Sequence, residues 1–556
     1  MIQTPFIQIA ATFHPADLVI VVVYLLGIVA LGLWSARREK ATANEYFLAG
    51  RNLRWPVIGL SLFATNISTV HLVGLAQSGY SHGLVYGNFE WLAAFCLILL
   101  GLVFAPFYFR NRVATLPEYL ERRFSGGSRT MLAVMAVFGA LFIHIGVSLY
   151  AGATIIEGFF GLNVYVSIIL ISAATTLYTV VGGLLAVVVT EAVQTVLLLA
   201  GAFIITLLGV MALGDAGVHD WSAFKAATKP DQLSMVHADG GFAWYAMLLG
   251  YPVLGVWYWC ADQTIVQRVL GARTERDAMV GPLFAGIIKV LPVFLMVFPG
   301  VMAYVLFKDV IGEQPDQTLP VLIDQLVPTG LKGLLAAGLL AALMSTVAGA
   351  LNSASTLVSI DIVKRLRPDT PEHTLVRIGR ITAVAVMVLA IAWSTQGKSF
   401  GGIFDGLNQM IACLAPPITA VFILGVFWPR GTKQAALATL SGGFLLGIVA
   451  FVLDFPAISK HLFGQNAQGQ PVQFITHTLG IPFMLQAWWL CVICGVLFVA
   501  VSLATPRPAP EQTEGLCWKN PLAAVFGSPI TGGWRDPRVL AAGLTVVMLA
   551  LYWVFR

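Results

Sequence analysis

Long apolar runs follow one another along almost the whole chain, from about Ala16 to Phe555. A membrane-spanning helix needs about 20 mostly apolar residues to cross a hydrocarbon layer about 30 Å thick. Only 11% of the 556 residues are charged and 58% are hydrophobic, whereas about a quarter are charged in an ordinary soluble domain. The pattern excludes a soluble fold and predicts an all-α polytopic membrane protein without a separate soluble domain.

Apolar runs bounded by charged residues, proline or glycine predict about fourteen transmembrane helices. The expected spans are 15–36, 54–79, 84–108, 130–159, 164–181, 186–211, 243–260, 277–307, 333–360, 375–397, 400–426, 434–454, 474–503 and 538–555.

Basic residues gather in alternate loops. Lysines and arginines are frequent in 37–54, 110–129, 268–276 and 364–380, whereas the loops on the opposite side, among them 215–239 and 309–324, are acidic or neutral. Because cytoplasmic loops carry an excess of basic residues, we expect the basic loops in the cytoplasm and both termini outside the cell. Topology therefore explains the net charge of +5 better than a nucleic-acid partner does, and we expect a multi-pass protein of the inner (plasma) membrane.

The N-terminus has no basic region before its first apolar run, so no cleaved signal peptide is predicted. Most of the cysteines lie within apolar runs, which is typical of reduced packing residues rather than of metal ligands or disulfides. They are Cys96, Cys260, Cys413, Cys491, Cys494 and Cys517.

The second predicted span contains a dense run of small, hydroxyl and amide residues, from Ser61 to His71. Such a run favours an interrupted helix, in which freed backbone carbonyls can bind a cation and the freed half-helix can face a substrate. A helix face that packs through small residues remains an alternative.

The short predicted span 243–260 carries Gly250, Pro252 and Gly255 just before three aromatic residues, and we expect a second interruption there. Two interrupted helices in corresponding positions of two five-helix halves indicate an inverted-repeat transporter with its site near the middle of the membrane. The correspondence lies in segment order and spacing, not in residue identity.

Three ionisable residues in or near the apolar runs stand out: His71, Glu90 and Lys289. Intramembrane charges usually mark a substrate path, although His71 and Glu90 can also be explained as residues that reach the membrane surface. Lys289 has about ten apolar residues on either side, which makes that explanation difficult. A lysine, a carboxylate, an amide and aromatic rings together can bind a polyol.

The span 333–360 contains Ser345 and Thr346 one turn after Ala342. Two hydroxyls and a backbone carbonyl can supply oxygen ligands to a small hard cation, although serine-rich membrane helices more often simply pack.

Several further motifs, taken together, resemble the solute:sodium symporters, and within them the sodium/glucose cotransporter branch. The resemblance covers roughly residues 45 to 435 and rests on the segments 46–51, 64–67, 89–91, 115–120, 257–263, 266–268, 352–356, 361–362 and 414–417, together with Lys289.

The resemblance implies a LeuT-type fold with two inverted five-helix repeats, one extra N-terminal helix and three C-terminal helices. The implied division is 1–53 for the extra helix and its loop, 54–211 for the first repeat, 212–242 for an extracellular loop, 243–426 for the second repeat and 427–556 for the C-terminal helices.

The resemblance also implies two sets of site residues. The sodium ion would be held by the carbonyls of Ala64, Ile67 and Ala342 and by the hydroxyls of Ser345 and Thr346. The sugar site would use Asn66, His71, Glu90, Tyr258, Trp259, Lys289 and Asn408, with Tyr258 as the inner aromatic gate.

Four positions compare with the family in different ways. Thr346 stands where serine is usual and keeps the hydroxyl, and His71 matches the animal glucose carriers. Asn408 replaces a glutamine of the sugar carriers, which leaves either a smaller pocket or a different substrate. Glu191 replaces an aspartate, so its role in closing the cytoplasmic side is open.

The implied function is sodium-coupled symport of a monosaccharide similar to glucose or galactose by alternating access. The alternative is sodium-coupled uptake of myo-inositol or of a carboxylated solute such as a sialic acid. A membrane enzyme or a sensor is disfavoured, since the sequence shows no phosphate-binding loop, zinc-ligand pattern or signalling domain. Sodium is expected to be co-transported, the partners are the sugar, sodium and the lipid bilayer, and a monomer is compatible with the sequence.

Overall fold

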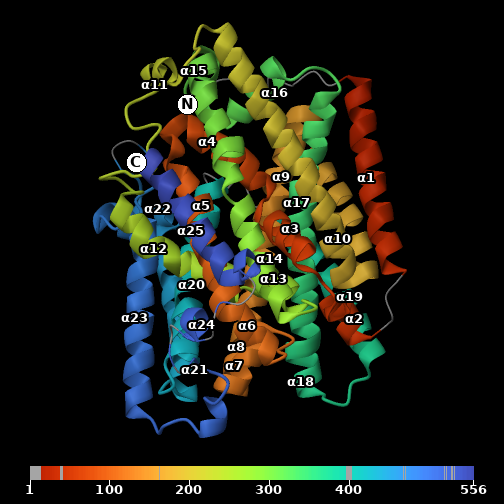
Figure 1. Cartoon of the computed structure of the whole chain (residues 1–556), viewed down its shortest axis with the longest axis vertical. Helices are drawn as coiled ribbons and strands as arrows, with labels where there is room; N and C mark the ends of the chain where they lie inside the picture. The colour runs from red at the N-terminus through yellow and green to blue at the C-terminus, as the bar shows by residue number, and fades with distance from the viewer. Residues whose placement is uncertain are drawn as a thin grey trace.

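The computed structural model describes residues 14–37, 42–161, 163–395, 403–466, 469, 471–518, 520, 523–527, 530 and 533–556. Within these ranges the regular structure is helical, and backbone pairing between extended segments is limited to three isolated bridges. Figure 1 shows most of the long helices running side by side between the two ends of the molecule. The predicted all-α architecture is confirmed.

The principal helices follow in chain order. They are α1 (Pro15–Ala36), α2 (Ala43–Leu48), α3 (Trp55–Asn66), α4 (Thr69–His82), α5 (Asn88–Leu99), α6 (Ala105–Arg110), α7 (Leu116–Arg123), α8 (Gly126–Phe138), α9 (Ser148–Phe160), α10 (Val164–Asp215), α11 (Trp221–Ala227), α12 (Trp244–Val256), α13 (Gln263–Leu270), α14 (Glu275–Ile288), α15 (Phe298–Ile311), α16 (Thr318–Leu326), α17 (Leu331–Thr356), α18 (Lys364–Leu366), α19 (Glu372–Ser394), α20 (Ile403–Phe427), α21 (Lys433–Asp454), α22 (Pro456–Phe463), α23 (Phe483–Ala504), α24 (Ala523–Phe526) and α25 (Pro537–Val554).

Eleven helices of the described ranges are long and apolar enough to cross a membrane, and the bent pair of α3 and α4 makes twelve. Two of the predicted spans, 164–181 and 186–211, fall together in the 52-residue helix α10. A third predicted span, 243–260, falls in α12 and the turn after it. Tryptophan, tyrosine and proline lower the mean hydropathy of this segment, so it is not one of the eleven. The count of fourteen stays a prediction.

Helix α10 is interrupted at Gly183, which has φ 51° and ψ −150°. A Cβ atom at this position would lie 2.4 Å from the Tyr46 carbonyl oxygen. Glycine is therefore required here both for the backbone conformation and for the close approach of α2. The interruption lies between the two predicted spans that α10 contains.

The predicted span 474–503 begins later than expected. Helix α23 starts at Phe483, directly after Pro482, and Phe474–Thr478 forms a separate helical turn. Asp454 Oδ1 accepts hydrogen bonds from the amides of Ile475 and Thr476 at 2.7 and 3.0 Å, which holds that turn against the end of α21. For the predicted span 400–426, residues 400–402 lie outside the described residues.

The first predicted interruption is confirmed. Helices α3 and α4 meet at an angle of 63° across Ile67 and Ser68, which both have extended backbones. The amide of Ser68 donates a hydrogen bond to His71 Nδ1 at 3.2 Å, and this contact stabilises the first turn of α4.

The second interruption is also present, but it lies downstream of the predicted position. Helix α12 continues through Pro252 and passes into a π-helical turn, Trp257–Ala261. The helix stops at Asp262, which has φ −88° and ψ 122° and whose side chain caps the next helix, α13. The break therefore follows the aromatic residues instead of preceding them.

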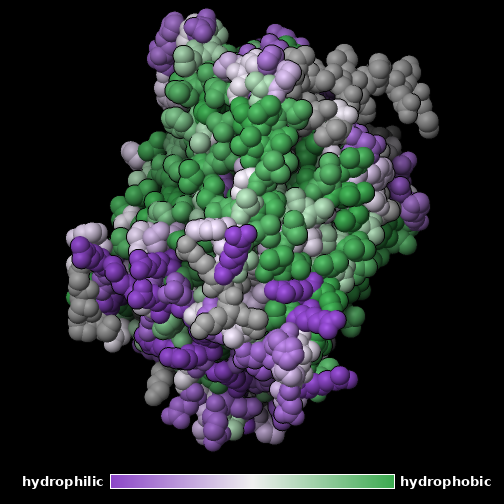
Figure 2. Space-filling view, turned by 90° about the vertical axis from the view of Figure 1, so that its right-hand side faces the viewer, coloured by the Kyte–Doolittle hydropathy of each residue, from purple (hydrophilic) through white to green (hydrophobic). Residues whose placement is uncertain are grey.

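Helix α17 forms the centre of the molecule and is almost entirely buried. It packs along α10, α1, α3 and α19. Helices α1, α21, α23 and α25 lie at the periphery, and most of their residues are exposed or half-buried. Figure 2 shows the resulting apolar belt between two more polar ends, as expected for side chains that face lipid.

The two ends of the bundle carry different loops. Helices α2, α7 and α18, which belong to the basic loops of the sequence, lie toward one end, and α11 and α16, which belong to the acidic segments, lie toward the other (Figure 1). The spatial arrangement thus separates the same two sets of loops that the charge pattern separates.

Candidate ion and solute sites

The oxygen atoms expected to hold sodium converge between α3 and α17. Ser345 Oγ lies 2.8 Å from the carbonyl oxygen of Ala64 and 3.0 Å from that of Ala342. Thr346 Oγ1 lies 3.1 Å from the carbonyl oxygen of Thr65 and 3.3 Å from that of Ala342. The structure therefore brings four of the five expected residues together around the end of α3, and Ile67, the fifth, is the next residue after this helix.

The end of α3 explains why oxygen atoms are available at this point. The last carbonyls of a helix have no partner within the helix, and the helix dipole makes this end negative. Each hydroxyl has one hydrogen but two carbonyl oxygens within hydrogen-bond range, so lone pairs face one another. A small cation without a carboxylate partner suits such a set of uncharged oxygens.

A buried charged cluster lies next to these oxygens. Glu191 on α10 forms an ion pair with Arg268 on α13 at 2.7 Å, and both side chains are fully buried. Ser61 also donates a hydrogen bond to Glu191, and Thr65 donates another at 2.9 Å. Since the Thr65 carbonyl accepts from Thr346, the cluster is continuous with the candidate ion site.

Glycine at position 349 makes room for this ion pair. A Cβ atom there would lie 2.5 Å from Arg268 Nη2 and 3.2 Å from Glu191 Oε1. The close approach of α17 to the cluster therefore depends on the absence of a side chain at Gly349.

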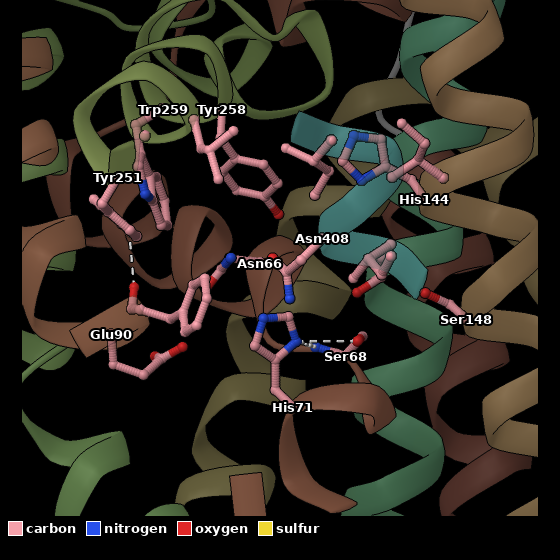
Figure 3. Close-up of a pocket in the computed structure, with 17 residues that line it drawn as sticks. Asn66, Ser68, His71, Glu90, His144, Ser148, Tyr251, Tyr258, Trp259 and Asn408 are labelled. Carbon is pink, nitrogen blue, oxygen red and sulfur yellow. Dashed lines mark hydrogen bonds between the residues drawn. The ribbon is translucent and has the colours of Figure 1, made fainter. Parts of the chain in front are cut away.

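A cavity lies beside the two helix breaks. Six of the seven expected sugar-site residues line it, and Figure 3 shows their polar groups directed toward the same space. They are Asn66, His71, Glu90, Tyr258, Trp259 and Asn408. Thr346 lines the cavity too, so the candidate ion site and the cavity share one side chain.

Lys289, the seventh expected residue, lies behind Glu90. The two side chains form an ion pair and each is only 1% exposed. The Lys289 ammonium also lies 5.5 Å from the Trp259 ring centroid and 5.9 Å from that of Phe63, distances at which a cation is attracted to a ring face. Glu90 thus presents a carboxylate to the cavity while Lys289 compensates its charge from the other side.

The amide and imidazole groups come from three different helices. Asn66 ends α3, His71 lies in the first turn of α4 and Asn408 lies on α20. Asn66 Oδ1 is buried and has no hydrogen-bond partner. A buried acceptor without a partner is costly, so this atom is available to a hydrogen-bond donor that enters the cavity.

Aromatic rings form the wall beside the second break. The Tyr258 and Trp259 rings have centroids 5.2 Å apart and meet at 72°. Beside Trp259 (Figure 3), Tyr251 donates a hydrogen bond to the Phe89 carbonyl at 2.8 Å, which fixes the start of α5 just before Glu90. Apolar ring faces next to amides and carboxylates are suited to the CH surface and hydroxyls of a sugar ring.

Several cavity residues were not predicted from the sequence. His144 and Ser148 lie one helical turn apart, and Ser68 lies at the first break; all three line the cavity. His144 is an ionisable residue within the apolar run 130–159, so the rule that selected Lys289 would also have selected it. Tyr251 and Phe89 gave no such signal, because aromatic residues are common in membrane helices.

The family model described as the sodium:solute symporter family matches residues 46–443, well over half of the chain. The chain belongs to the sodium:solute symporter family. The expected family resemblance is therefore confirmed, and this symporter is a multi-pass membrane carrier that couples solute movement to sodium rather than an enzyme.

Curated relatives match the symporter over nine-tenths of its length. A sodium/glucose cotransporter 2 of Rattus norvegicus is 35% identical over 540 residues, which cover 90% of this chain and 80% of the relative. A sodium/myo-inositol cotransporter 2 of Mus musculus is 36% identical, with 93% and 81% covered. A sodium/mannose cotransporter of Bos taurus is 36% identical, with 90% and 89% covered.

Solved structures share the fold. A sodium-coupled sialic acid symporter in a substrate-bound outward-open state matches with a TM-score of 0.73 and 20% identity, over 89% of this chain and 99% of its own. Mhp1, a nucleobase-cation-symport-1 family transporter in a closed conformation, matches with a TM-score of 0.54 and 14% identity, over 84% and 97%. These similarities confirm the LeuT-type fold.

Proposed function

We propose that this symporter carries a neutral cyclic polyol, a monosaccharide similar to glucose or galactose, together with sodium. The observation that carries the proposal is the lining of the cavity: a carboxylate, two amides, two imidazoles and four aromatic side chains surround one space next to convergent hydroxyl and carbonyl oxygens. Planar polar groups bind hydroxyls in pairs, and ring faces cover the CH surface of a pyranose.

The proposed roles divide the residues into two sets. Ala64, Ile67, Ala342, Ser345 and Thr346 bind sodium through carbonyl and hydroxyl oxygens. The polar side chains of the cavity bind the solute, and Lys289 keeps Glu90 ionised and oriented. Because Thr346 borders both spaces, bound sodium orders one wall of the solute cavity.

Charge argues against a carboxylated solute. Glu90 faces the cavity and repels an anion, whereas Lys289, the cation nearest to it, already pairs with Glu90. Burying a carboxylate without a free cation is costly. A sialic acid is therefore a weaker candidate than a neutral sugar, although a solved structure with this fold is named for sialic acid.

Myo-inositol is the second candidate, since it is a neutral ring that carries only hydroxyls. Several curated relatives bear the name sodium/myo-inositol cotransporter 2 at 34–36% identity. Asn408, which is shorter than the glutamine of the sugar carriers that the sequence resembles, lines the cavity, so its length affects the room that a solute has there.

Transport proceeds by alternating access. Sodium binds between α3 and α17 and favours the state that binds solute from outside; both then leave toward the cytoplasm. One inward-moving charge gains about 2.3 kcal/mol per 100 mV, and a tenfold sodium gradient adds about 1.4 kcal/mol. Together these allow accumulation of several hundred-fold for each co-transported ion.

We also propose that the symporter lies in the plasma membrane with its basic loops inside and both termini outside. The repeat boundaries 54–211 and 243–426 belong to the same proposal, because the two helix breaks fall near the beginning of each half.

Uptake into proteoliposomes that contain the purified full chain tests the proposal. An imposed inward sodium gradient should drive accumulation of a radiolabelled hexose, and a potassium gradient should not. Competition by unlabelled hexoses, myo-inositol and sialic acid then ranks the solutes, with the neutral rings expected to compete and sialic acid to fail. Uptake that is strongest for sialic acid would overturn the assignment to a neutral polyol.

A further inference from the structure

The cavity has a second polar wall that none of the expected site residues provides. Figure 3 places His144 and Ser148 on the side of the cavity opposite Glu90, with Asn66, His71 and Asn408 between the two walls. His144 and Ser148 are four residues apart in continuous helix, so their side chains share one face. The cavity therefore offers polar groups at both of its ends.

A buried carboxylate orients His144. His144 Nε2 lies 2.7 Å from Asp262 Oδ2, and the two side chains are 6% and 5% exposed. The other oxygen, Asp262 Oδ1, accepts a hydrogen bond from the Thr264 amide at 2.8 Å at the start of α13. Asp262 is thus fixed by the helix break and in turn fixes the imidazole.

The neighbouring rings restrict the imidazole further. Its centroid lies 6.3 Å from that of Trp257, with an interplanar angle of only 16°, and 5.8 Å from that of Tyr258. Contacts on the ring and at Nε2 restrict rotation of the His144 imidazole, so the edge of the ring that carries Nδ1 keeps a constant direction.

The partner of Nε2 decides what the other nitrogen can do. An ionised carboxylate only accepts hydrogen bonds, so Nε2 carries the hydrogen that is donated to Asp262. In the neutral imidazole Nδ1 is then an acceptor. A solute hydroxyl that contacts His144 can therefore bind only to Nδ1, and it must donate a hydrogen bond to that atom.

We propose that His144, oriented by Asp262, is a specificity-determining residue of this symporter that accepts a hydrogen bond from one hydroxyl of the solute at the end of the ring remote from Glu90. The inference rests on the proposed function, because it assumes a neutral cyclic polyol in this cavity. Ser148 supplies a second hydroxyl partner one turn away on the same helix face.

The arrangement of charges makes the inference specific about the solute class. Glu90 lines one end of the cavity and is paired with Lys289, whereas Asp262 lies behind His144 at the other end and accepts a hydrogen bond from its neutral imidazole. A neutral ring with hydroxyls at both ends can bind both walls, whereas a carboxylate at either end would meet a like charge. The second wall therefore excludes anionic sugars at the end that Glu90 does not reach.

Substitution of His144 tests the role directly. In proteoliposomes, His144→Ala should raise the KM for the preferred hexose about tenfold while the sodium concentration for half-maximal uptake changes less than twofold. His144→Gln, which retains an acceptor, should recover part of the affinity. His373→Gln, at an exposed histidine of α19, is the matched control and should leave both constants unchanged.

Solute analogues identify the hydroxyl that His144 addresses. A series of hexoses in which each hydroxyl in turn is replaced by fluorine removes one donor at a time. For one analogue the loss of affinity should be about tenfold in the wild-type protein and less than twofold in His144→Ala, because the same hydrogen bond is already absent. Losses that multiply independently for every analogue would contradict the contact.

Asp262 is a positioning residue, and its substitution separates orientation from capping. Asp262→Asn keeps an oxygen that can cap α13 but removes the charge that orients His144. We expect the KM to rise about threefold in the wild-type background and to remain unchanged in the His144→Ala background. An equal effect in both backgrounds would show that Asp262 acts only through the helix break.

The outcomes separate the inference from the proposed function. If the wild-type protein takes up no neutral polyol in a sodium gradient, the proposed function fails and the inference fails with it. If uptake is sodium-dependent but His144→Ala leaves the KM of every solute unchanged in correctly folded protein, only the inference fails. Folding is checked by size-exclusion chromatography and by the unchanged sodium constant.

Discussion

The two helix breaks of this symporter present different chemistry to the centre of the membrane. At the first break, two extended residues bend the chain by 63° and leave the carbonyl oxygens at the end of α3 without helical partners. At the second break, helix α12 passes through Pro252, and a single extended residue, Asp262, separates the aromatic turn from α13. The first break offers backbone oxygens, and the second offers side chains.

This difference teaches how one fold can separate ion binding from solute recognition. Backbone carbonyls are uncharged and present whatever the side chains are, which suits a small cation. Side chains vary freely from one protein to another, which suits the selection of a solute. We infer that changes at the second break alter which solute is carried, and that changes around the first alter how sodium drives it.

The two breaks are joined by the buried ion pair of Arg268 and Glu191. Arg268 lies on α13, after the second break, and Ser61 and Thr65, which donate to Glu191, lie on α3, before the first. If α13 moves away from α3, either the ion pair and hydrogen bonds of this cluster must break or the cluster must move together with α13. Among the substitutions predicted below, a change in this ion pair is expected to have the largest effect, and the effect is on protein stability.

Removing one partner of this pair should destabilise the protein severely. Arg268→Met leaves a buried carboxylate without its cation, at a cost of about 3–5 kcal/mol. The thermal transition of detergent-purified protein should fall sharply, and the double variant Arg268→Met/Glu191→Gln should recover most of the loss. Equal stability of the single and double variants would mean that the pair does not hold the two breaks together.

Loss of the Glu90 carboxylate should impair solute recognition more than any other change in the cavity. A hydrogen bond to a charged group contributes about 1.5–3 kcal/mol, so Glu90→Gln should lower Vmax/KM for hexose uptake about 10- to 150-fold. The sodium constant should move far less. The double variant Glu90→Gln/Lys289→Met removes the unpaired cation and controls for misfolding; it should restore stability without restoring uptake.

A change at the first break should act on sodium. Thr346→Ala removes one neutral hydroxyl, worth about 1 kcal/mol, and should raise the sodium concentration for half-maximal uptake about fivefold. Thr346→Ser keeps the hydroxyl and serves as the matched control, with a change below twofold. If Thr346→Ala altered only the solute KM, the assignment of this residue to the ion site would be wrong.

The aromatic wall at the second break should have an effect on the solute similar in size to the effect of the Thr346 hydroxyl on sodium. Aromatic stacking contributes about 0.5–1.5 kcal/mol, so Tyr258→Ala should raise the hexose KM about 2- to 12-fold. Tyr258→Phe retains the ring and should stay within twofold of the wild type. A larger loss in Tyr258→Phe than in the alanine variant would indicate that the hydroxyl, not the ring, contacts the solute.

The sequence predicted those features that depend on composition and local pattern. Apolar length predicted the membrane spans, and the polar run from Ser61 to His71 predicted the first break because such residues are unusual in lipid. The convergence of Ala64, Ala342, Ser345 and Thr346 was expected from the family resemblance, and their hydrogen bonds fit that expectation.

Features that depend on packing were harder to predict. Pro252 indicates a break in the sequence, yet α12 continues through it, and the helix ends only where Asp262 can cap α13. The pairing of His144 with Asp262, 118 residues later in the chain, follows from the tertiary fold alone. Lys289 was predicted as a solute ligand from its apolar flanks and from the family resemblance, whereas its position behind Glu90 depends on how α14 packs against α5.

Equilibrium binding measures the central claim, that the ion site and the solute cavity communicate, most directly. Isothermal titration of the purified symporter in nanodiscs gives the hexose Kd at saturating sodium and in potassium alone, and the sodium Kd with and without hexose. Linkage requires each ligand to lower the Kd of the other by the same factor, and we expect a factor of about ten for both. A hexose Kd that is identical in sodium and in potassium would contradict the account.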